Sequence, residues 1–112
     1  RPKELMDKGY FVNALVQSFA GNNSPIIKLR SIISNFNKEL FAMSVPPFAV
    51  EYHKQIISIN LFLIDRLGVI QNNAKTDPQV AMRAAQELKG GLPAAISNFN
   101  SLQGKLLSTA TP

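Results

Sequence analysis

The sequence predicts an all-α fold, an antiparallel up-down-up-down four-helix bundle. Two observations support this prediction: apolar residues recur every three or four positions along four segments, and prolines with turn-forming residues separate those segments. With 112 residues the chain has the length of one domain, and a hydrophobic content of 46% supplies a core. We expect residues 1–107 to form one helical-bundle domain and residues 108–112 to form a linker-like tail.

The first two predicted helices cover residues 3–20 and 25–44. The turn residues Gly21-Asn22-Asn23 separate them, and Ser24 followed by Pro25 is typical of a capping residue and a first helical position. The first helix places apolar residues at helical spacing: Leu5, Val12, Leu15, Val16 and Phe19. The second has the clearest apolar stripe and lacks the alternation of a strand: Ile26, Leu29, Ile33, Phe36, Leu40 and Met43.

The third predicted helix covers residues 47–73, after the break at Pro46-Pro47. Its main stripe continues through most of its length: Tyr52, Ile56, Ile59, Leu63, Leu67 and Ile70. It also carries a second apolar set: Ile57, Leu61, Phe62 and Ile64. A helix that is apolar on most sides is either central in the bundle or covered by a partner. We therefore predict an interface at Ile57, Leu61 and Ile64, with another protein chain or a second copy of this chain.

The fourth predicted helix begins at Pro78, which follows the capping residue Asp77, and runs to about Leu107. Its apolar residues keep one register: Ala81, Ala85, Leu88, Leu92, Ala95, Phe99, Leu102 and Leu106. The sequence Gly90–Pro93 interrupts it, because proline cannot donate a helical hydrogen bond and each glycine costs about 1 kcal/mol relative to alanine. We predict one helix kinked or broken near Gly90–Pro93, with two collinear short helices as the alternative.

The charge pattern excludes several classes of function. The net charge is +5 and the pI about 9.8, but acidic residues are spread among the basic ones, so we expect no nucleic-acid binding. Without cysteine, disulfides and thiolate metal sites are excluded. The longest uncharged apolar stretch, residues 55–64, is too short to cross a membrane, so we expect no membrane insertion by this segment. The low charge content and the start at Arg1 suggest an excised piece of a longer, extracytoplasmic protein, although a cytoplasmic one stays open.

Three polar residues of the third helix are candidate binding residues: Tyr52, His53 and Asn60. His53 is the sole histidine, and the residues three and four positions away cannot ligate a metal, so no metal site is expected. We interpret it as a boundary histidine hydrogen-bonded to a neighbouring helix or loop, with a ligand-contacting or pH-sensing role as the alternative. Asn60 lies among apolar residues, where it either fixes the register of the bundle or lies partly exposed on its surface.

No arrangement of residues predicts catalysis. Glu39 and Glu51 flank the Pro46-Pro47 break, but solvated acids on helix surfaces explain both. No nucleophile elbow and no phosphate-binding loop is present, and we expect no cofactor. The sequence therefore predicts a non-enzymatic helical interaction or scaffold module. The alternative is a bundle that binds a small apolar ligand or lipid, with Tyr52, His53 and Asn60 near the mouth of its cavity.

Overall fold

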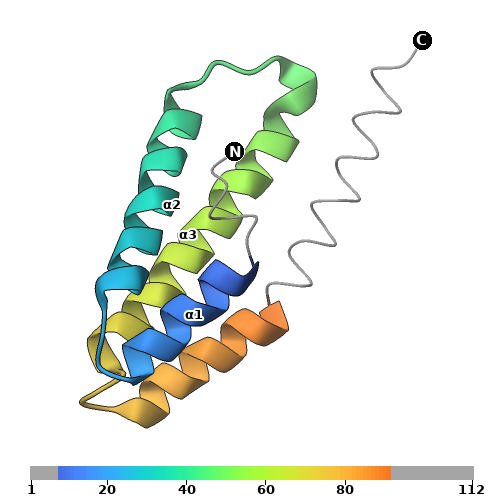
Figure 1. The fold of residues 1–112 in the computed structure, drawn as a ribbon. Coiled ribbons are helices and arrows are strands. Elements are labelled where there is room, and N and C mark those ends of the chain that lie inside the picture. The colour runs from blue at the N-terminus through green and yellow to red at the C-terminus, as the bar shows by residue number, and fades with distance from the viewer. Residues whose placement is uncertain (1–7, 92–112) are drawn as a thin grey trace.

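The computed structural model describes residues 8–91, and helices make up most of this range (Figure 1). Helix α1 spans Lys8–Phe19, α2 spans Ser24–Ala42 and α3 spans Val50–Asn73. A short 3-10 helix, η2, covers Pro47–Ala49, and a fourth helix covers residues 78–91. No strand occurs between residues 8 and 91, which confirms the predicted all-α class.

Parts of three predictions lie outside the described residues. The predicted start of the first helix at residue 3 precedes them. The proposed kink near Gly90–Pro93 extends past them, and the domain boundary at residue 107 follows them.

Helices α2 and α3 lie side by side and run in opposite directions (Figure 1). Three hydrogen bonds join the two helices, and residues later in α2 contact residues earlier in α3. The bonded pairs are Arg30 with Ile64, Asn37 with Asn60, and Leu40 with His53. Helix α1 and the fourth helix pack against one half of this pair, and the other half projects beyond them. The buried core gathers where these helices meet: Ala14, Ile26, Leu29, Ile33, Leu63, Leu67, Ile70, Ala74, Ala81, Ala84 and Leu88.

The buried face of α1 agrees only in part with the predicted one, since Leu15 and Phe19 are half-buried and pack against the core. Val12 and Val16 are exposed, whereas Ala14 and Ser18 are fully buried. Small side chains four residues apart let the α1 backbone lie close to its neighbours. Burial of the Ser18 hydroxyl is compensated because its Oγ donates to Oδ1 of Asn23 at 2.7 Å. Small residues therefore take the most buried positions of α1, beside two residues of the predicted stripe.

The start of α2 is shifted by one residue from the prediction. Asn23, and not Ser24, occupies the capping position, and Oδ1 of Asn22 accepts a hydrogen bond from the Ser24 backbone N–H at 3.1 Å. The side chain of Asn23 makes no cap, because it accepts from Ser18 and donates from Nδ2 to the carbonyl oxygen of Gln71 at 3.3 Å. A tertiary bridge between α1 and α3 thus replaces the local capping contact.

The connection between α2 and α3 agrees with the proline pattern but shortens the predicted stripe. Helix α2 ends at Ala42, so Met43 falls in the connection and is exposed, whereas the sequence places it on the buried stripe. Pro47 begins η2, and the regular α3 helix begins only at Val50. Asp77 precedes the fourth helix as predicted, where its Oδ1 accepts from the Val80 backbone N–H at 3.4 Å.

Candidate functional site

A row of polar contacts follows the line where α2 meets α3. Arg30 of α2 donates from Nε to the carbonyl oxygen of Ile64 at 3.2 Å and from Nη1 to Oε1 of Gln71 at 3.0 Å. Gly68 of α3 allows this close approach, since a Cβ atom there would lie 2.9 Å from Nη2 of Arg30. The arginine side chain therefore lies against the backbone of α3 and ties the two helices together.

Asn60 of α3 is buried and paired, so the prediction that it lies partly exposed on the bundle surface is wrong. Its Nδ2 donates to Oδ1 of Asn37 at 2.9 Å, and the two side chains are 5% and 4% exposed. Nδ2 of Asn37 is buried without a hydrogen-bond partner. Because a buried amide is costly when unpaired, this pair favours one alignment of α2 with α3. Asn37 was not among the predicted site residues, although its position on an apolar helix face resembles that of Asn60.

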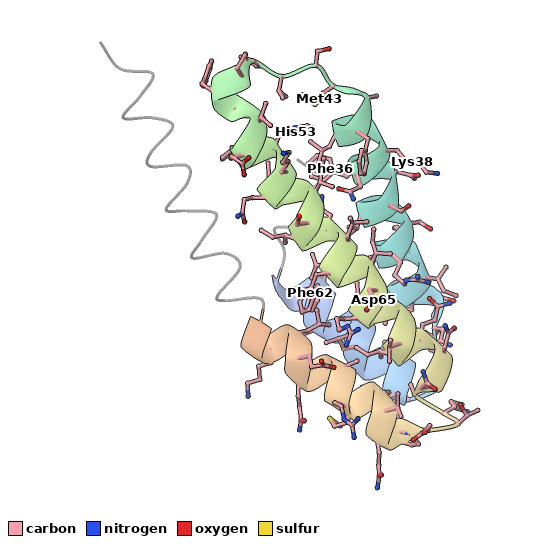
Figure 2. All side chains as sticks on the ribbon, turned by 180° about the vertical axis from the view of Figure 1, so that it is seen from behind. Phe36, Lys38, Met43, His53, Phe62 and Asp65 are labelled. Carbon is pink, nitrogen blue, oxygen red and sulfur yellow. The ribbon has the colours of Figure 1, made fainter. Side chains whose placement is uncertain are left out.

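His53 contacts the end of α2, as its interpretation as a boundary histidine predicts. Its Nε2 lies 2.6 Å from the carbonyl oxygen of Leu40, near the end of α2, and the same oxygen accepts from the Met43 backbone N–H at 3.2 Å. Figure 2 shows His53 and Phe36 between α2 and α3, below the connection that carries Met43. Tyr52 is half-buried on the adjacent position of α3.

The three candidate binding residues do not converge on one point. His53 and Asn60 both face α2, but seven residues of helix, about 10 Å, separate them. Each has its own protein partner, Leu40 for His53 and Asn37 for Asn60. Both histidine and asparagine therefore stabilise the pairing of α2 with α3.

The asparagine pair divides the neighbouring residues of α2 and α3 between two sides. On each helix, the residues four positions before and three positions after the asparagine lie on the same side of the α2–α3 pair. Three of these four residues are buried in the core: Ile33, Leu40 and Leu63. The residues three positions before and four positions after each asparagine lie on the opposite side of the α2–α3 pair. These are Ser34 and Phe41 on α2 and Ile57 and Ile64 on α3. With Leu61, which lies between Ile57 and Ile64 on α3, these four residues form a second surface, here named the outer α2–α3 face.

The α3 side of the outer α2–α3 face consists of the predicted interface residues and is incompletely covered. Leu61 is 51% exposed. Ile57 and Ile64 are half-buried, and Ile64 also packs against the core. The predicted set therefore lies on one side of α3, partly open to solvent.

The α2 side of the outer α2–α3 face is apolar only towards the end of that helix. Phe41 is 66% exposed, and the antiparallel alignment brings it near the level of Ile57. Seven residues earlier on the same stripe of α2 lies half-buried Ser34, which is small and polar. Exposed Ile27 lies a further seven residues towards the start of α2. Ser34 and the side chain of Arg30 separate Ile27 from Phe41. The apolar part of this face is thus Phe41, Ile57, Leu61 and Ile64.

The ion pairs between residues 8 and 91 lie on helix surfaces and involve Arg66 and Lys54. Arg66 hydrogen-bonds Asp65 and, through Nη1, donates to Oε1 of Glu87 at 2.9 Å, which joins α3 to the fourth helix. The bond to Asp65, and after it the bond to Glu87, raises the pKa of the Arg66 guanidinium above its ordinary value. Glu51 lies 3.8 Å from Nζ of Lys54. Between residues 8 and 91 no group of three or more acidic, histidine or cysteine side chains could hold a metal ion.

Comparison with known proteins finds no matching family model, no significantly similar curated protein and no significantly similar solved structure. Within the described range, each helix is too short or too polar to cross a membrane.

Proposed function

We propose that the chain is a non-enzymatic helical interaction module, an antiparallel up-down-up-down four-helix bundle whose fourth helix is kinked or broken near Gly90–Pro93. In this proposal, two copies associate through the outer α2–α3 face. One observation carries it: Phe41 and Leu61, from two different helices, lie on the same side of the α2–α3 pair, and each exposes more than half of its surface.

An exposed face of this kind gains stability when another surface covers it. Burial of a large aliphatic or aromatic side chain contributes about 1.5–3 kcal/mol. Single exposed apolar residues are common on monomers, but neighbouring ones from two helices are typical of a protein interface. The half-buried Ile57 and Ile64 extend the apolar surface beside Leu61, and Ser34 adds one small hydroxyl, which a polar rim accommodates.

The charges beside this face favour a second copy of the chain as the occupant. A net charge of +5 would oppose self-association if only basic residues bordered the interface. Instead, exposed Lys38 lies three residues before Phe41 on α2, and exposed Asp65 lies four residues after Leu61 on α3 (Figure 2). A two-fold dimer can bring the α2 side of one copy beside the α3 side of the other, so that unlike charges meet.

The proposal of a non-enzymatic role is supported by what the candidate catalytic groups contact. Nε2 of His53 is engaged with the carbonyl oxygen of Leu40, so this ring helps to end α2. Glu51 lies beside Lys54, and Glu39 is exposed on α2. These contacts account for each side chain as part of the fold or of the solvated surface.

Sedimentation velocity over a range of concentrations tests the proposal on the full chain. We expect a reversible dimer, and we expect Leu61→Asp to shift it to monomer, because a charge would be buried in the interface. Met82→Asp is the matched control, since Met82 of the fourth helix is 49% exposed but lies outside the outer α2–α3 face.

Two results would contradict the proposal. The first is a chain that stays monomeric at the highest attainable concentrations. No second copy would then bind the outer α2–α3 face, and its partner would be a different protein. A dimer that Met82→Asp disrupts as strongly as Leu61→Asp would place the interface elsewhere. Circular dichroism of both variants shows whether each retains its helices.

A further inference from the structure

The connection between α2 and α3 forms the end of a hairpin that projects beyond α1 and the fourth helix (Figure 1). Met43 and Phe48, on either side of the Pro46-Pro47 pair, are 55% and 58% exposed. The two prolines are exposed as well, and Figure 2 shows Met43 at this end of the hairpin. Residues 43–48, here named the hairpin tip, therefore present two large apolar side chains to solvent.

The sequence around the hairpin tip carries no charge. Residues 40–50 contain neither acidic nor basic side chains, and the charged residues resume at Glu39 on α2 and Glu51 on α3. Lys38 and Lys54 lie close behind them, and all four side chains are exposed. Two acids and two bases therefore border the tip. The tip alone, and not the helices behind it, can leave water without the cost of burying a charge.

The backbone of the hairpin tip leaves few hydrogen-bond donors unpaired. Pro46 and Pro47 have no N–H group. The backbone N–H of Met43 donates to the carbonyl oxygen of Leu40 at 3.2 Å, and that of Ala49 donates to the carbonyl oxygen of Pro46 at 2.9 Å. Because an unpaired N–H is costly in a medium that offers no acceptor, this pairing suits the tip to contact with lipid. A protein groove can supply acceptors and places no such requirement on the backbone.

The exposed apolar area of the hairpin tip is small for a protein interface. With about 200 Å² for a large side chain, Met43 and Phe48 together expose roughly 200 Å² at these exposed fractions. The two prolines add to this area but leave it below the roughly 800 Å² that a stable protein interface buries on each partner. A lipid surface sets no such minimum, because binding strengthens with each apolar side chain that it buries.

We propose that the hairpin tip inserts into the headgroup region of a lipid bilayer, with Met43 and Phe48 in contact with the acyl chains. A membrane span needs about 20 apolar residues, which no helix between residues 8 and 91 supplies, whereas interfacial insertion needs only a few exposed side chains. The lysines behind the tip are long enough to keep their ammonium groups among the lipid headgroups. Insertion uses the end of the hairpin and self-association uses its side.

Sedimentation of the full chain with phosphatidylcholine vesicles tests this proposal. We expect the chain to bind these uncharged vesicles. Met43→Asp should lower the partition coefficient at least about tenfold, because a carboxylate would have to enter the apolar region or withdraw the tip from it. Met82→Asp is the matched control and should leave the partition coefficient unchanged, since Met82 is 49% exposed on the fourth helix. Circular dichroism shows whether both variants retain their helices.

A fluorescent reporter at the tip measures insertion directly. The chain has no tryptophan, so Phe48→Trp introduces a single one. Its emission should shift to shorter wavelength when phosphatidylcholine vesicles are added, because the indole ring leaves water for the membrane interface. The emission of the control variant Met82→Trp should not shift. Phe41 stays unchanged in all variants because it belongs to the outer α2–α3 face.

Three outcomes would overturn the proposal. The first is the absence of vesicle binding, which would leave the tip to a protein partner. The second is an equal loss of binding in Met43→Asp and Met82→Asp. The third is binding only to vesicles that contain anionic phosphatidylserine, abolished by high salt, which would assign the attraction to the net charge of +5.

The variants of the two surfaces separate this proposal from self-association. Leu61→Asp should retain vesicle binding although it removes the proposed dimer. Met43→Asp should retain the dimer although it loses vesicle binding. A variant that loses both would show that the hairpin tip and the outer α2–α3 face act as one surface, against the proposal of a separate lipid contact.

Discussion

Arg30 of α2 occupies the space beside Gly68 of α3 in which any side chain at position 68 would lie. A Cβ atom there would be 2.9 Å from Nη2 and 3.1 Å from Cζ of Arg30. The same guanidinium hydrogen-bonds the carbonyl oxygen of Ile64 and the side chain of Gln71. One arginine therefore holds two turns of α3 because a glycine lies between its partners.

Gly68→Ala should destabilise the protein by about 2–5 kcal/mol, as expected when the displaced guanidinium loses both hydrogen bonds. Alanine is the better helix former by about 1 kcal/mol, but its Cβ would displace the guanidinium. Hydrogen bonds from a charged group contribute about 1.5–3 kcal/mol, and Arg30 makes two of them across this contact. Urea denaturation measures the change in the free energy of unfolding.

The matched background is Arg30→Met, which removes the guanidinium but keeps an unbranched apolar side chain. There, Gly68→Ala should stabilise the protein by about 1 kcal/mol, because only helix propensity remains. Equal effects of Gly68→Ala in the two backgrounds would show that Arg30 and Gly68 are not coupled.

Asn60→Leu should destabilise the protein by about 1–3 kcal/mol, since it removes the partner of the buried Asn37 amide. The double variant Asn37→Leu/Asn60→Leu should recover most of this loss, because two apolar side chains leave no amide unpaired. Chemical denaturation of the two single variants and the double variant completes the cycle. Additive losses in the double variant would contradict the pairing.

Ala14→Leu should destabilise the protein by about 1–3 kcal/mol, because a larger side chain overpacks the fully buried position on α1. Val12→Leu on the same helix should change the free energy of unfolding by less than about 0.5 kcal/mol, since Val12 is exposed. Thermal unfolding followed by circular dichroism measures both. If Val12→Leu destabilised the protein more than Ala14→Leu, the position of Val12 on the predicted apolar stripe would be the buried one.

Two glycines should respond to alanine with opposite signs. Gly21→Ala should destabilise the protein by about 1–2 kcal/mol, because φ at Gly21 is +97° and the new Cβ would lie 2.6 Å from Cε of Lys75. Gly90→Ala should stabilise it by about 1 kcal/mol, because Gly90 is helical and its Cβ would meet open space. Differential scanning calorimetry of both variants tests this contrast.

The residues of α3 at the candidate site could be predicted from the sequence, but their partners on α2 could not. His53 and Asn60 were predicted as candidate binding residues from their positions on a mostly apolar helix, and the structure gives each of them a partner on α2. Their partners, Leu40 and Asn37, belong to another helix, and the alignment of two helices is not encoded in the spacing within either one. The apolar set of Ile57, Leu61 and Ile64 was visible in the sequence, but its continuation onto Phe41 depends on the same alignment.

Short-range patterns of residues determined the all-α class, the proline-marked breaks and most of the buried stripe of α2, because helical periodicity, caps and proline act within a few residues. Contacts between helices decided the rest. Ala14 and Ser18 replace Val12 and Val16 on the inner face of α1, and Asn23 hydrogen-bonds Ser18 and Gln71 in place of a cap. Close packing selects small side chains where backbones approach, and a buried polar group takes whichever partner the fold brings within reach.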